Sequence, residues 1–128
     1  MTTFLASTFL HGFNFQLGSV LMSLGFFIYT ENQVRSKLSL IFNASIGTRK
    51  GTTEQNFRHK EAAVWVMLVN FGFGILAYVH LMYLGVMFDQ SEVQTEGYKW
   101  THTIAKWESL NFFSHYFMGM SFLLSLVL

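Results

Sequence analysis

Residues 62–88 read AAVWVMLVNFGFGILAYVHLMYLGVMF, a run of 27 residues without an acidic or basic side chain. A helix needs about 20 mainly apolar residues to cross a bilayer, so this run is long enough to span one. Two further uncharged runs, 4–29 and 109–128, lie on either side of it. We therefore predict an all-α, polytopic membrane protein with three transmembrane helices at about 4–29, 62–88 and 109–128.

The composition agrees with this prediction and excludes several other classes. Of the 128 residues, 52% are hydrophobic and only 12% are charged, about half the charged fraction of an average soluble domain. The formal net charge is +1, so we expect no nucleic acid as a partner. The partner that the uncharged runs imply is a lipid bilayer. The chain has no cysteine, which excludes disulfides, zinc thiolates and a thiol nucleophile. A soluble protein with three buried core helices is the alternative, but such helices rarely exceed about 20 residues.

The charged residues orient the predicted spans. Residues 30–61 carry six basic residues, whereas 89–108 carry two basic and four acidic ones. The positive-inside rule predicts a cytoplasmic loop at 30–61 and a lumenal loop at 89–108. Within the first loop, Val34, Leu38 and Ile41 recur at helical spacing. This pattern predicts either a continuation of the first helix or an amphipathic segment on the membrane surface.

Small and polar residues form stripes along the predicted spans. In the first run they are Ser7, His11, Asn14, Gly18, Met22 and Gly25, beside a second stripe that includes Gln16 and Ser23. The second run offers Ala63, Asn70, Gly74, Ala77 and Gly85, and the third offers Asn111, Ser114, His115, Met118, Gly119 and Ser125. Such residues favour helix contact over lipid. Because three helices cannot easily bury all of them, we expect contacts with further membrane helices.

Three of the five histidines lie inside the uncharged runs. With alternating helix directions, His11, His80 and His115 fall about 9–12 Å below the same, lumenal boundary. An ionisable group at this depth is a functional candidate. Each could bond a polar group of a neighbouring helix, ligate haem or a metal, or act as a general base. His59 and His102 lie in the loops and are expected to be solvated.

The run LHGFNFQLGSVLMSLGF at residues 10–26 resembles the histidine helix of the membrane-bound O-acyltransferase family. The likeness continues, in the same order, through residues 31–38, 80–85, 97–98, 106–107 and 114–115. It therefore covers nearly the whole chain. The histidine block is its most specific part.

The resemblance implies a multi-pass enzyme of the endoplasmic reticulum membrane. Such an enzyme would transfer a palmitoleoyl group from palmitoleoyl-CoA to a serine hydroxyl of Wnt proteins. His11 matches the family's catalytic histidine, and its expected role is general base toward that hydroxyl. Acyl-CoA is then a co-substrate, and neither a resident cofactor nor a metal is expected.

The family pairs this histidine with an asparagine on an earlier segment, and this sequence begins only ten residues before His11. We therefore expect the chain to be the C-terminal portion of such an enzyme, incomplete and inactive by itself. The alternative is a non-enzymatic three-helix membrane subunit that binds haem or a metal through His11, His80 and His115.

Overall fold

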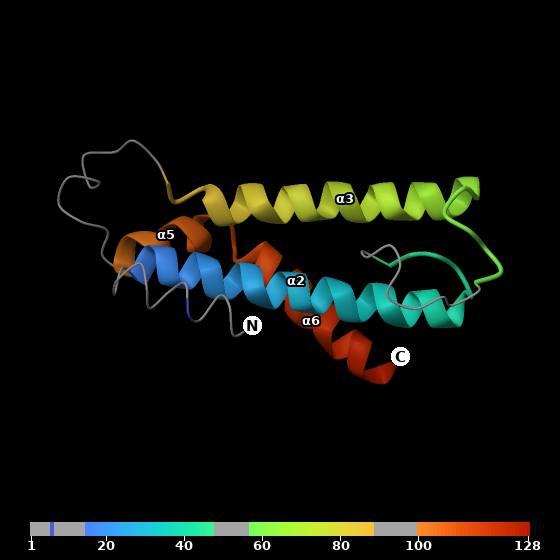
Figure 1. Ribbon diagram of the computed structural model, residues 1–128. Coiled ribbons are helices and arrows are strands. Elements are labelled where there is room, and N and C mark those ends of the chain that lie inside the picture. Colours follow the sequence, from blue (N-terminus) through green and yellow to red (C-terminus); the bar gives the residue numbers. More distant parts are fainter. Residues whose placement is uncertain (1–5, 7–14, 48–56, 89–99) are drawn as a thin grey trace.

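A computed structural model describes residues 6, 15–47, 57–88 and 100–128 of the chain (Figure 1). Within these residues, the helices with defined bounds are α2 (Phe15–Ile41), α3 (Val64–Gly85), α5 (Trp100–Ser109) and α6 (Phe113–Val127). The same residues contain no β-strand, and one isolated bridge joins Ala44 to His59. The predicted all-α fold is confirmed for this part of the chain.

Helix α2 extends beyond the predicted first span. It continues unbroken to Ile41, although the uncharged run ends at residue 29. The added residues include leucine, glutamate, arginine and lysine, which are good helix formers, and no proline interrupts them. The first of the two alternatives, a continuing helix, is therefore confirmed. Residues 4–5 and 7–14 of the predicted span lie outside the described residues.

A left-handed turn ends α2. Asn43 has a φ of 48°, a conformation that asparagine tolerates better than most residues. Its N–H donates to the Leu40 carbonyl at 3.4 Å, and the Ala44 N–H donates to the Ser39 carbonyl at 3.0 Å. This pair of bonds is a Schellman motif, which satisfies carbonyls that the helix end would otherwise leave unpaired. The chain therefore leaves the helix axis directly after Phe42.

Helix α3 matches the predicted second span to within two or three residues at each end. In the described part of the chain it is the one helix that is by itself long and apolar enough to cross a membrane. Only 11% of its apolar 18-residue window is buried, whereas the core helix of a soluble protein is mostly buried. A helix this apolar and this exposed needs lipid or further protein to cover it.

The third predicted span is not one straight helix. Helix α5 occupies the end of the segment 89–108, which we predicted as a loop, and α6 begins only at Phe113. The two helices are bent by 79° relative to each other. Counted together as one broken span, they raise the number of candidate membrane crossings in the described residues to two. The three predicted spans are therefore not all confirmed.

The bend follows from a second Schellman motif. The Phe112 N–H donates to the Trp107 carbonyl at 3.0 Å, and the Asn111 N–H donates to the Glu108 carbonyl at 2.8 Å. Asn111 and Phe112 both have positive φ, 51° and 47°. Asn111 is thus an exposed turn residue, and its predicted place on the inward face of the third helix is wrong. The uncharged run did not reveal the break, because this turn requires no charge, glycine or proline.

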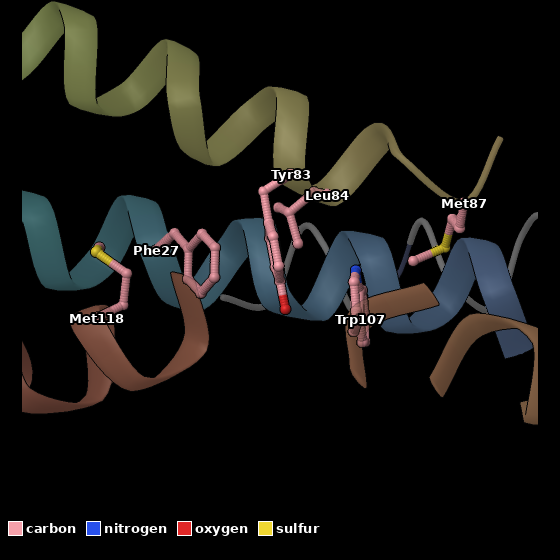
Figure 2. Packing of buried hydrophobic residues seen from close by; sticks show 6 residues of the cluster. All are labelled: Phe27, Tyr83, Leu84, Met87, Trp107 and Met118. Carbon is pink, nitrogen blue, oxygen red and sulfur yellow. The ribbon is translucent and has the colours of Figure 1, made fainter. Parts of the chain in front are cut away.

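The main hydrophobic core lies where the helices converge on α2, which contacts α3, α5 and α6 (Figures 1 and 2). Its buried members are Phe27, Tyr83, Leu84, Met87, Trp107 and Met118. A smaller cluster of Ala44, Ile46 and Val66 fixes the start of α3 against the turn after α2. Of the small-residue stripe predicted on α2, Gly18 and Gly25 are buried, but Met22 between them is 40% exposed.

Polar bonds join α2 to α3 at both ends. Near the start of α2, Gln16 Nε2 donates to the Met87 carbonyl at 3.0 Å. Near its end, the Arg35 guanidinium donates to Glu31, to the Asn70 side-chain oxygen and to the Ile46 carbonyl, each at 2.8 Å. We predicted Arg35 as a charge of the cytoplasmic loop. It is instead a buried helix residue, and the loop begins only after α2 ends.

Candidate functional site

His115 of α6 connects two other helices through its two ring nitrogens. A hydrogen bond of 3.0 Å joins Nε2 to the Ser23 hydroxyl of α2, and one of 2.8 Å joins Nδ1 to the Tyr83 hydroxyl of α3. A neutral imidazole donates through one nitrogen and accepts through the other, so it bonds these hydroxyls in opposite senses. The side chain therefore links α2, α3 and α6 at one level.

His80 of α3 forms the second polar link at this level. Its Nδ1 and the Ser114 hydroxyl of α6 are 2.7 Å apart, and both side chains are buried. Ser114 directly precedes His115, and His80 lies one helical turn before Tyr83. The two histidines therefore share a layer, as their positions in the sequence predicted.

Aromatic rings enclose this layer. The Phe27 ring lies 5.2 Å from the His80 ring and 5.4 Å from the His115 ring, centroid to centroid. Trp107 of α5 lies 4.6 Å from His115 and stacks on Tyr83 at 6.2 Å. Figure 2 shows Phe27, Tyr83 and Trp107 lying along α2 within the core. Because hydrogen bonds are electrostatically stronger in such an apolar setting, they hold the helices in a defined register.

The structure describes two of the three predicted candidates. His80 and His115 each bond a polar group of a neighbouring helix, as the simplest of the three interpretations expects. Among the described residues, no group of three His, Cys, Asp or Glu side chains is close enough to hold a metal ion. His11, the predicted general base, lies outside the described residues.

The two loop histidines are less exposed than predicted. His59 is half-buried, and its ring packs edge-on against Trp65 at 5.3 Å. His102 is half-buried within α5. Both are therefore only partly exposed to solvent.

Sequence reasoning did not assign Phe27, Tyr83 or Trp107 to this layer. Tyr83 and Trp107 lay within the stretches that carried the family resemblance, but nothing in their spacing indicated a contact. One signal was available for Tyr83, which follows His80 by three residues and so shares its helix face. Phe27 carried no such signal, because the faces of an apolar helix look alike in sequence.

Fold and site together are typical of a helical membrane protein. Helix α3 is apolar and largely exposed, while histidine, serine and tyrosine side chains bond one another between the helices. Buried polar pairs of this kind contribute to the association of membrane helices.

The chain is similar to porcupine, a protein-serine O-palmitoleoyltransferase. It is 37% identical to the Mus musculus protein and 35% identical to the Homo sapiens protein, each over 119 residues and 91% of this chain. It is 28% identical to the Anopheles gambiae protein over 98% of this chain. In each case the chain spans about 26% of the length of the curated relative. No family model matches the chain. The resemblance inferred from the histidine block is thus confirmed.

Proposed function

We propose that this chain is part of a protein-serine O-acyltransferase that transfers a palmitoleoyl group from palmitoleoyl-CoA to a serine hydroxyl of Wnt proteins. The observation that carries the proposal is 37% identity to an O-palmitoleoyltransferase over 91% of the chain. The histidine block at residues 10–26 is the part of this likeness most specific to the family. Acyl-CoA enters as a co-substrate, and the proposal requires no resident cofactor.

The proposed setting is the endoplasmic reticulum membrane, crossed by α2, by α3 and by the bent pair α5 and α6. Two polar links between α2 and α3 support this placement. Gln16 and Arg35, which make them, are 19 residues apart, a rise of about 28 Å along a helix. The hydrocarbon core is about 30 Å thick. Both links can therefore lie near its boundaries, with Gln16 toward the lumen and Arg35 toward the basic, cytoplasmic segment. This places the first crossing at about 16–35, later in the chain than the 4–29 expected from the uncharged run.

The proposed role of His11 is general base. One ring nitrogen takes the proton from the acceptor serine as its oxygen attacks the thioester carbonyl. The carbon–sulfur bond then breaks, the ester forms, and the CoA thiolate takes the proton back from the imidazolium. Its place in the histidine block supports this role, because His11 matches the family's catalytic histidine.

The test replaces His11 in the intact enzyme in cells. We expect His11→Ala to lower the incorporation of an alkyne-tagged palmitoleate into the Wnt serine by about 10²–10⁴-fold, the usual contribution of a general base. His59→Ala is the matched control, since His59 lies in the segment after α2, and its transfer should stay near the wild-type value. Immunoblots must show equal protein levels for all three proteins.

Two outcomes would contradict the proposal. Transfer retained by His11→Ala would exclude its role as the base. If the wild-type enzyme modified no Wnt serine under the same conditions, the proposed activity itself would be wrong.

A further inference from the structure

A cavity of about 350 Å³ opens between α2, α3 and α6. Its walls are mainly apolar and include Val34, Phe73, Leu76, Phe117 and Met118. Small-molecule sites are typically concave, apolar and about 300–1,000 Å³ in volume, with a few polar groups that orient the ligand. The cavity has the size and lining of such a site, so its polar groups decide what it can bind.

Two polar atoms in the cavity wall have no hydrogen-bond partner among the described residues. They are Nε2 of His80 and Oγ1 of Thr30, on residues that are 5% and 0% exposed. Both residues line the cavity. Buried polar groups are nearly always hydrogen-bonded, because an unpaired group forfeits its bonds to water. Two unpaired polar atoms at one apolar cavity therefore indicate a hydrogen-bonding ligand that fits inside the cavity.

The remaining groups restrict the charge of that partner. Glu31 also lines the cavity, and its carboxylate is paired with Arg35 at 2.8 Å. A ligand carboxylate or phosphate would lie near Glu31 while its countercharge is already engaged, so an anion is disfavoured. A cation would compete with Arg35 for the same carboxylate. A neutral ligand meets neither obstacle.

The hydrogen-bonding capacity of the two free atoms restricts the ligand further. Nδ1 of His80 is engaged by Ser114, so Nε2 donates or accepts according to the tautomer, and a threonine hydroxyl can do both. A ligand hydroxyl satisfies either arrangement. From these observations we infer that the cavity binds a neutral single-chain lipid with a hydroxyl head, such as a long-chain alcohol or a monoacylglycerol. Its chain lies along the apolar wall, and its hydroxyl bonds Thr30 and His80.

The test is photolabelling of the chain in its native membrane with a diazirine analogue of hexadecanol, followed by mass spectrometry of the labelled peptides. We expect labels on α3 and α6 peptides around the cavity, and competition by unlabelled hexadecanol. The matching analogue of hexadecanoate, which carries a carboxylate, should label these peptides far less.

Two pairs of variants assign the label to the cavity. Thr30→Val removes one hydrogen bond at constant volume and should weaken half-maximal labelling about two- to tenfold. Thr103→Val is its control, because that hydroxyl is equally buried and unpartnered but lies outside this cavity. Gly72→Leu places a side chain in the cavity and should abolish labelling. A Cβ meets no atom within 4 Å at Gly72 or at Gly74, and Gly74 is not part of this lining, so Gly74→Leu should label normally.

Three outcomes would overturn the inference. One is labelling that survives Gly72→Leu, and another is equal labelling by the hexadecanoate probe. The third is a protein adduct instead of a lipid adduct from a photoreactive amino acid placed at Leu76, which would show that a protein segment fills the cavity.

Discussion

Arg35→Met tests the polar link that fixes the far end of α2. The guanidinium bonds the Glu31 carboxylate, the Asn70 side chain and the Ile46 carbonyl, each at 2.8 Å, and lies 4.9 Å from the centre of the Phe73 ring. Methionine keeps a flexible apolar stem against that ring but removes all three bonds. The substitution therefore separates the stability that the guanidinium hydrogen bonds contribute from the stability that the packing of the side-chain stem contributes.

The expected loss of unfolding free energy is about 3 kcal/mol. Removing one partner of a buried ion pair costs about 3–5 kcal/mol, because the other charge is left without compensation. The Arg35 and Glu31 side chains remain 11% and 17% exposed, so water can partly solvate the orphaned carboxylate. We therefore take the lower end of that range.

The measurement is the unfolding free energy of the chain in mixed micelles, from titration with a denaturing detergent. Arg58→Met is the control, because Arg58 is exposed and lies outside the helices, and it should change stability by less than about 0.5 kcal/mol. The double variant Arg35→Met with Glu31→Leu should be more stable than Arg35→Met alone, since the unpaired charge is gone. If the double variant were no more stable, the loss would not come from an uncompensated carboxylate, and our reasoning would be refuted.

Two further predictions concern the histidine layer and the bend before α6. Tyr83→Phe removes the hydroxyl that bonds His115 and should lower the unfolding free energy by about 1–2 kcal/mol in the same titration. Tyr78→Phe, at a 65% exposed position, should leave it almost unchanged. Equal effects of the two variants would contradict the proposed role of this bond. Asn111→Gly should leave stability unchanged or raise it slightly, because glycine adopts the φ of 51° at this exposed site without strain. Asn111→Val should lower stability by about 1–2 kcal/mol, because a β-branched residue does not. Similar stabilities for the two variants would rule out the left-handed turn.

The sequence alone predicted the helical class and the two histidines of the described site, His80 and His115. The uncharged run 62–88 predicted α3 closely, because its composition suits lipid along its whole length. His80 and His115 were placed at one level by counting residues from the charge boundaries. The stripes were less informative: on α3 the buried side includes Val66, His80 and Leu84, while Gly74 and Gly85 of the predicted stripe are exposed.

The sequence by itself determined the lengths of the apolar segments, the charged residues that bound them and the histidine block at 10–26. Each of these depends only on composition or on local order along the chain. Only the tertiary structure decided that Arg35 is buried, that α5 and α6 meet at a 79° bend, and that His80 and His115 bond Ser114, Ser23 and Tyr83. The physical reason is that these features depend on pairs of groups far apart in the chain, or on a left-handed turn at an asparagine. A hydrogen-bond partner 92 residues away, as Ser23 is for His115, leaves no periodicity in the sequence.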